Sequence, residues 1–146
     1  MHPREALRRQ VTDEIRACLP PSAFVSSSLA RDIPSGSGLA AVVYTPSETI
    51  SRVSANGEAR ASQPVKRTTT ISILVLAFDS GTGETAMAAA DDAARLIELR
   101  LATSFSNLSF QSASSTVSAG ERTGAQVEMS YSVTHTDSMQ HGDQSA

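Results

Sequence analysis

The run VKRTTTISILVLAFD at residues 65–79 constrains the fold more than any other part of this sequence. Its β-branched residues favour a strand, in which successive side chains point to opposite faces. The faces would divide as follows: Thr69, Ile71, Ile73 and Val75 on one, and Leu74, Leu76 and Phe78 on the other. The second half of the strand is therefore apolar on both faces. Such a strand needs either helices on both sides or another subunit on one side.

Two segments show the periodicity of amphipathic helices. The first, Pro3–Cys18, has proline near its first turn and ends before the pair Pro20 and Pro21. The second follows Thr82 as a candidate N-cap, has Glu84 in its first turn and runs to about Ser104. The expected core-facing residues are Leu7, Val11, Ile15 and Cys18 in the first helix, and Met87, Ala90, Ala94, Ile97 and Leu101 in the second.

Four further strands are expected. Residues 24–26 and 39–44 form two of them, and residues 107–117 and 125–135 form a closing hairpin. The last strand alternates apolar and polar residues, which predicts one dry face and one polar face. Between the second and third strands, residues 45–63 contain Pro46, Asn56 and Gly57, and we predict a long loop that becomes ordered on assembly.

The predicted fold is α+β, in the order α–β–β–long loop–β–α–β–β. At 146 residues the chain has the length of one domain. We expect residues 1–136 to form this domain, with a mainly antiparallel sheet and two helices packed on one face. Residues 137–146 are polar, and we expect a disordered C-terminal tail.

Cysteine and histidine residues give no pattern of a catalytic or metal site. Cys18 is the single cysteine, and its spacing in the first helix favours a buried thiol. His2, His135 and His141 lie near the chain ends without the spacing of metal ligands on a helix. We therefore expect no metal and no cofactor.

The remaining candidates for chemistry are also weak. Residues 80–84 (SGTGE) resemble an anion-binding turn, but they lack the lysine of a P-loop. Asp91 and Asp92 are adjacent on a helix, so their side chains point about 100° apart and do not share one site. The sequence therefore predicts a non-enzymatic protein.

Charge is distributed unevenly along the chain. Residues 1–78 carry nine basic and six acidic groups, a net charge of +3, whereas residues 79–146 carry three basic and nine acidic groups, a net charge of −6. This difference is either ordinary surface variation or the mark of opposite faces that pack head to tail. A basic stripe interleaved with aromatic residues, typical of nucleic-acid binders, is not evident. We also expect neither a membrane span nor a secretory signal.

Several strings resemble the tail terminator family of long-tailed phages, typified by the minor tail protein U of phage lambda. The opening HPREALRRQVTDEIRAC resembles the N-terminal helix of that family, and LAAVVYT at residues 39–45 resembles its strand before a long loop. TTISILVLAF at residues 69–78 resembles the strand that leaves the loop. Residues 84–101 match the central helix in position, and VEMSYSVTHT at residues 127–136 resembles the closing strand.

The resemblance implies a structural virion protein that assembles into a ring, usually a hexamer. Such a ring caps the completed tail tube at its head-proximal end and provides the surface for the head-completion protein. DNA would pass through it only as cargo, and assembly would take place in the host cytoplasm. The alternatives are another neck or head-completion protein and, from a different class, a small-molecule-binding or enzymatic α+β domain.

A head-to-tail ring would place the basic loop of one protomer near an acidic surface of the next. The candidate interface residues are Arg52, Arg60, Lys66, Arg67, Leu74, Leu76, Phe78, Asp91, Asp92 and Glu98. Because exposed ion pairs contribute only about 0–1 kcal/mol each, replacing Arg60 and Arg67 with glutamate is expected to weaken the ring while barely changing the thermal stability of the protomer.

Overall fold

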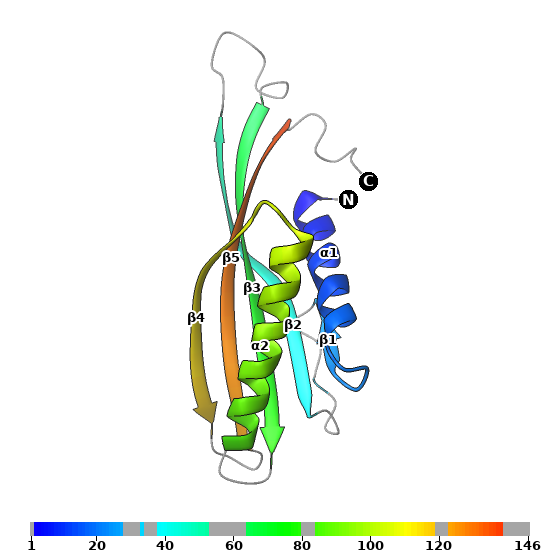
Figure 1. The fold of residues 1–146 in the computed structure, drawn as a ribbon. Helices are drawn as coiled ribbons and strands as arrows, with labels where there is room; N and C mark the ends of the chain where they lie inside the picture. The colour runs from blue at the N-terminus through cyan, green and yellow to red at the C-terminus, as the bar shows by residue number, and fades with distance from the viewer. Residues whose placement is uncertain are drawn as a thin grey trace.

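The computed structural model describes residues 2–27, 33, 38–52, 64–79, 84–118 and 123–138 (Figure 1). This part of the chain is a mixed α+β domain with one sheet, as predicted. Its elements in chain order are α1 (Pro3–Cys18), β1 (Phe24–Ser26), β2 (Leu39–Arg52), β3 (Pro64–Asp79), α2 (Glu84–Ser104), β4 (Leu108–Ser118) and β5 (Thr123–Ser138).

The sheet has five strands in the order β1-β2-β3-β5-β4. β1 pairs with β2 in parallel, and the other three pairings are antiparallel. β3 is the middle strand and pairs with β5 over its full length, from Pro64 opposite Ser138 to Asp79 opposite Thr123. The apolar run at residues 65–79 is therefore central because it has hydrogen-bonded neighbours on both sides.

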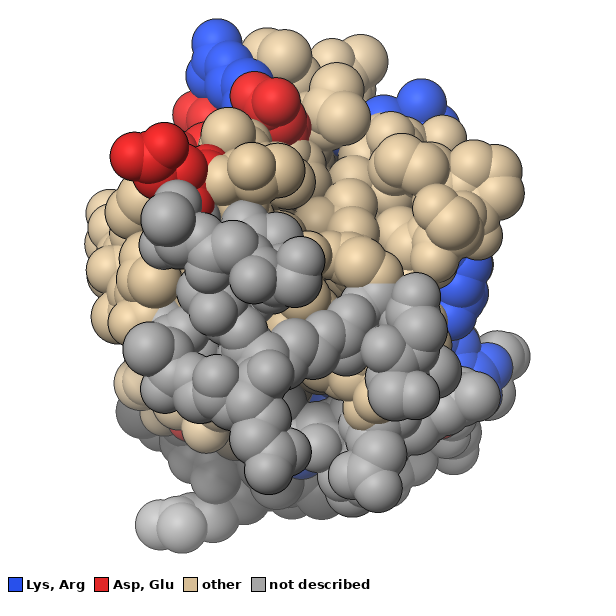
Figure 2. All heavy atoms as spheres, turned by 90° about the horizontal axis from the view of Figure 1, so that it is seen from below, with Lys and Arg blue, Asp and Glu red and all other residues tan. Residues whose placement is uncertain are grey.

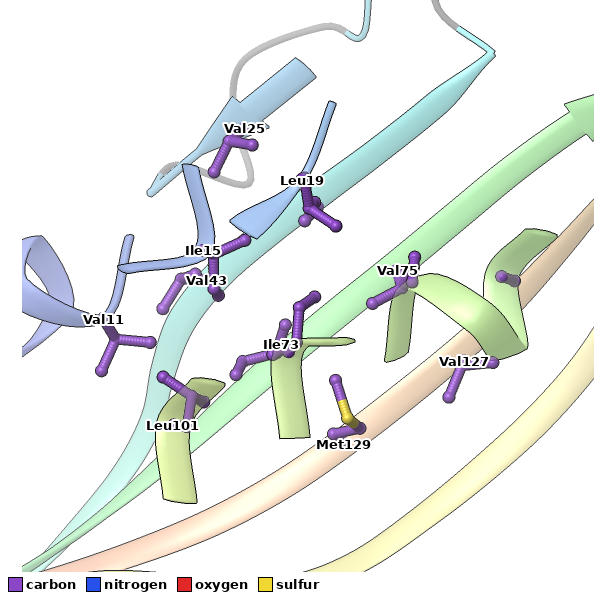
Figure 3. Close-up of a cluster of buried hydrophobic side chains, with 14 of the residues drawn as sticks. Val11, Ile15, Leu19, Val25, Val43, Ile73, Val75, Leu101, Val127 and Met129 are labelled. Atoms are coloured by element: carbon purple, nitrogen blue, oxygen red, sulfur yellow. The ribbon is translucent and has the colours of Figure 1, made fainter. Parts of the chain in front are cut away.

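Both helices contact the same face of the sheet (Figure 1), which we call the helix side. Buried side chains from α1, α2 and the sheet form one core there, with Ile73 and Val75 of β3 near its middle (Figure 3). A polar link also joins the helices, because Arg100 of α2 donates from Nε to Glu14 Oε2 of α1 at 2.5 Å. The opposite face, which neither helix covers, is called the open face below.

The helix stripes are largely as predicted. Val11 and Ile15 of α1 are fully buried, and Leu7 and Cys18 pack against the core while staying partly exposed. In α2 the prediction for Met87 was wrong, since its side chain is 40% exposed. The buried stripe of α2 consists of Ala86, Ala90, Ala93, Ile97 and Leu101, and Ala94 is partly buried. The helix is therefore rotated so that small alanines lie against the sheet and Met87 points past it.

The alternation in β5 is confirmed. Residues Ala125, Val127, Met129, Tyr131 and Val133 are buried on the helix side. The residues between them are less buried on the open face: Gln126, Glu128, Ser130, Ser132 and Thr134. This strand therefore has the dry face and the polar face that its period of two predicts.

The predicted long loop is wrong for its first part. β2 continues through residues 45–52 to pair with the start of β3, with Arg52 opposite Val65. The register shifts between Tyr44 and Ser47, and Pro46 lies at this irregularity, where a missing N–H interrupts no regular ladder. A strand forms here because the extended start of β3 supplies the hydrogen-bonding partner. Residues 53–63 lie outside the described part of the chain.

Two smaller predictions concern the C-terminal tail and the start of α2. Asp137 and Ser138 belong to β5, so the predicted disordered tail is wrong for these residues, and residues 139–146 are not described. Glu84 lies in the first turn of α2, as predicted, whereas Thr82 lies outside the described residues.

Candidate assembly surfaces

An apolar strip lies on the open face of β3. Leu74, Leu76 and Phe78 are partly exposed there, and their neighbours on the other face of the strand are fully buried. Phe78 packs over Gly124 of β5, since a Cβ built on this glycine would lie 3.1 Å from Phe78 Cδ1. The structure therefore brings three of the predicted interface residues together on one surface.

The rest of the open face includes the buried apolar residues Ala40 and Val42 of β2, which lie opposite Leu76 and Leu74, and is otherwise polar with little charge. Tyr44 of β2 reaches across β3 and donates from its hydroxyl to Glu128 Oε1 of β5 at 3.2 Å. Burial raises the pKa of Tyr44, and the negative charge of Glu128 adds to this effect, while the hydrogen bond with Ser72 opposes it. Elsewhere hydroxyl groups predominate, as in the contact of 3.1 Å between the Oγ1 atoms of Thr68 and Thr134.

A buried ion cluster joins α1, β2 and β3 on the helix side. Arg67 of β3 donates from Nη1 to Glu48 Oε1 of β2, and Arg4 Nε of α1 lies 3.3 Å from Glu48 Oε2. The Glu48 and Arg67 side chains are only 5% and 9% exposed. This cluster fixes the outer part of the β2–β3 pair against the first turn of α1.

The cluster corrects the predicted role of Arg67. This residue is not on a solvated loop that could contact a neighbouring protomer, because the extension of β2 places Glu48 beside it inside the protein. Lys66, which precedes Arg67 in the chain, is exposed, as an interface residue would be. Arg52 ends β2, its side chain is not described, and Arg60 lies outside the described residues.

The acidic candidates lie on α2. Asp91 and Asp92 are exposed, as predicted. Glu98 is partly buried and pairs with Arg95 Nη1 at 3.0 Å. Burial raises the pKa of Tyr131 to about 12, with the nearby Glu98 carboxylate as a second cause. Figure 2 shows acidic side chains gathered on one side of the lower end of the molecule, beside surface that carries mostly uncharged residues.

The candidate groups therefore do not form one continuous surface. The apolar strip occupies the open face, and Asp91 and Asp92 lie on the helix that covers the opposite face. Lys66 lies near the start of β3, toward the upper end in Figure 1, whereas Asp91 and Asp92 lie in the lower half of α2. Lys66 and the pair Asp91 and Asp92 thus lie toward opposite ends of one protomer.

An additional surface that was not predicted is the outer edge of the sheet at β4. Residues 109–117 are all exposed, and the strand LSFQSASSTVS contains no charged residue. Phe110 stacks on Tyr131 with ring centroids 4.9 Å apart but stays 39% exposed. The signal that could have revealed this edge is the strand's lack of charge, because exposed edge strands usually carry some.

His2 and Cys18 have structural contacts in α1. His2 caps α1, since its Nδ1 accepts a hydrogen bond from the Arg4 backbone N–H at 3.1 Å. Cys18 is partly buried, as its place in the stripe predicted, and burial raises the pKa of its thiol. His135 is partly exposed on β5, and His141 is outside the described residues. Within the described ranges, no three His, Cys, Asp or Glu side chains form a group that could hold a metal ion.

A surface hollow of about 690 Å³ lies where α1 leads into β1. Leu19, Pro20 and Phe24 contribute to its lining. Its charged residue, Arg16, is already engaged, since it donates to the Val25 carbonyl at 3.2 Å and pairs with Asp13 at 3.3 Å. A small-molecule site needs several convergent polar groups, which these lining residues do not supply.

Comparison with known proteins adds no relative. The sequence matches no protein-family model, and a search of curated proteins finds no similar sequence. In the described part of the chain, neither helix has the length and apolar character needed to cross a membrane.

Proposed function

We propose that this protein is a phage tail terminator, a structural protein without catalytic activity. Its protomers would assemble into a ring, a hexamer in the family it resembles, that caps the tail tube and stops its growth. The observation that best supports assembly is the apolar strip of Leu74, Leu76 and Phe78 on the open face, because neither helix covers it.

The location of this strip favours contact with another protein chain. The two helices already bury the helix side of β3, and among the described residues no further helix is present to cover the open face. Burial of apolar surface contributes roughly 25 cal/mol per Å², and a partner chain would supply that burial. The polar residues that directly flank the strip are Gln126 and Glu128 of β5. A partner would therefore have to desolvate one carboxylate there, which already accepts a hydrogen bond from Tyr44.

The proposed partners are other copies of this chain, the tail tube protein and the head-completion protein. The ring would lie at the head-proximal end of the tail after assembly in the host cytoplasm. The net charge of −6 over residues 79–146 is compatible with DNA passing through the ring as cargo, because acidic surfaces repel phosphate groups. A role as another neck component would use the same surfaces and differ in which virion part the ring binds.

The test is assembly of the purified protein with and without isolated tail tubes. Mass photometry should find one closed oligomer, and electron microscopy should show rings at one end of the tubes. The Leu76→Ser variant should assemble at least tenfold less well, whereas Leu99→Ser, on the exposed side of α2, should assemble normally. A protein that stays monomeric at all concentrations and does not bind tubes would contradict the proposal, whereas rings that bind head components alone would favour the neck alternative.

A further inference from the structure

The five described strands form a sheet with two edges on its opposite sides. At one edge, β4 pairs with β5 and with no other described strand. At the other edge, β1 pairs with residues 40–42 of β2. Residues 47–52 of β2 therefore have β3 on one side and, among the described residues, no strand on the other. Backbone N–H and C=O groups along such edges are available to another strand.

The β4 edge lacks most of the features that normally prevent strand pairing. Proteins protect exposed edges with charges, prolines, short strands or bulges. β4 has eleven residues, without a charge or a proline, and only one irregularity, between Phe110 and Ser112. A strand with this composition is suited to pairing with another strand in the assembled protein.

Exposed apolar side chains mark both edges on the same side of the sheet. Phe110 of β4 lies opposite Tyr131 and stacks on its ring, so it points to the helix side. Ile50 of β2 lies opposite Arg67, whose side chain binds Glu48 on the helix side, and Ile50 is 49% exposed. If the two edges met, these two apolar side chains would lie on one face and could cover each other.

The strand directions are compatible with such a contact. β2 is antiparallel to β3, β3 to β5, and β5 to β4, so β2 and β4 run in opposite directions. When β4 of one copy meets β2 of a second copy with the helix sides aligned, the new pair is antiparallel. The sheet then continues from one copy into the next, with the helix sides of both copies on the same side of the joined sheet.

We propose that β4 of one protomer pairs in antiparallel fashion with residues 47–52 of β2 in the next protomer, with Phe110 opposite Ile50. The occupant of the β4 edge is thus a second copy of this chain. The contact joins two different surfaces, so it is of the head-to-tail type that generates rings when the rotation closes. It rests on the proposed function, because it supplies the contact that would join the protomers of the ring.

Disulfide cross-linking tests this pairing. Cys18→Ser gives a background without thiols, because Cys18 is the single cysteine. Directly opposed residues of an antiparallel pair have Cα atoms about 4.5–5.5 Å apart, within the range that a disulfide spans. A variant with both Ile50→Cys and Phe110→Cys should form, on mild oxidation, a ladder of covalent multimers that ends at the ring size. A mixture of the two single variants should stop at dimers.

Matched controls define the specificity of the cross-link. A variant with Ile50→Cys and Leu99→Cys should form at most one-tenth of the multimers, because Leu99 is exposed on α2 away from the edge. Ser51→Cys with Ser109→Cys is a second pair from the same register, at two exposed positions where replacement should not affect folding. Either pair in the predicted register should give the ladder.

The outcomes separate this pairing from the proposed function. Rings on tail tubes without a cross-link from either cysteine pair would overturn the pairing and leave the terminator proposal intact. Dimers of the single Phe110→Cys variant would also overturn it, since they would show β4 paired with β4. A complete ladder from a protein that does not bind tail tubes would support the pairing and contradict the terminator role.

Discussion

Arg67 on β3 and Glu48 on β2 form an ion pair inside the protein, with almost no exposure of either side chain. They are nineteen positions apart in the chain. They meet because β2 extends past its irregularity and places Glu48 opposite Thr69, next to Arg67 on the same face. The pair joins the outer halves of β2 and β3, and the contact between Arg4 and Glu48 links both strands to α1.

Breaking this pair should destabilise the protomer strongly. Glu48→Ala leaves the buried Arg67 without its carboxylate partner, which costs about 3–5 kcal/mol for buried pairs. Arg67→Glu should be at least as harmful, since it places two carboxylates together, so we now expect a large loss of thermal stability in place of the small one expected from the sequence. Urea unfolding measures the loss in the free energy of unfolding. The control is Glu5→Ala, which breaks an exposed pair with Arg9 and should cost less than about 1 kcal/mol. Equal losses for Glu48→Ala and Glu5→Ala would contradict the structural role.

Gly124 and Phe78 should be energetically coupled. In the wild type, Gly124→Ala places a methyl group 3.1–3.2 Å from two Phe78 ring carbons, and such overpacking costs about 1–3 kcal/mol. In a Phe78→Ala background the ring is absent, so the same change should stabilise the strand by roughly 0.5–1 kcal/mol. A double-mutant cycle by urea unfolding measures the coupling, and additive effects would show that Phe78 is not the obstacle.

The orientation of α2 can be tested by substitutions on neighbouring residues. Ala90 is fully buried against the sheet, so Ala90→Leu should cost about 1–3 kcal/mol through overpacking. Met87 is largely exposed, and Met87→Lys should change the free energy of unfolding by less than about 0.5 kcal/mol. Thermal and urea unfolding of both variants provide the comparison. A larger loss for the Met87 variant would mean that the helix is rotated toward the arrangement expected from the sequence.

The two tyrosines should respond oppositely to removal of their hydroxyl groups. Tyr131 is buried and its hydroxyl has no hydrogen-bond partner among the described residues, so Tyr131→Phe should be neutral or slightly stabilising at pH 7. Tyr44 donates to Glu128, so Tyr44→Phe should cost about 0.5–1.5 kcal/mol. Chemical unfolding at pH 7 measures both free energies. A clear loss of stability in the Tyr131 variant would show that its hydroxyl is satisfied in solution.

Tyr131 should also affect stability at alkaline pH. Burial raises its pKa from 10.0 to about 12 in the folded protein, so the folded state holds the phenolic proton more tightly than the unfolded state. Its contribution to stability is complete below pH 10 and is lost as the pH rises toward about 12. The free energy of unfolding of Tyr131→Phe should therefore fall less steeply with pH over this range than that of the wild type. Urea unfolding at a series of pH values measures this dependence. The same dependence of stability on pH in the variant and the wild type would show that the pKa of Tyr131 is not raised.

The sequence alone determined the kind of each major element. A period of two marked β5 and the two faces of β3, and an apolar stripe with flanking prolines placed α1 at Pro3–Cys18. It also indicated that Leu74, Leu76 and Phe78 share a face. These features follow from the local chain, because side-chain direction in a strand or helix depends only on position along that element.

Only the tertiary structure decided which elements are neighbours and how far they extend. Residues 45–52 look like a loop in isolation, but β3 offers them a hydrogen-bonding edge, and this pairing makes them a strand and buries Glu48 with Arg67. The rotation of α2 that exposes Met87 likewise depends on the sheet that α2 packs against and on α1 beside it. The unpaired edge at β4 also appears only once β5 is placed beside β3. Each of these features arises from contacts between residues distant in the chain, and local periodicity carries no information about them.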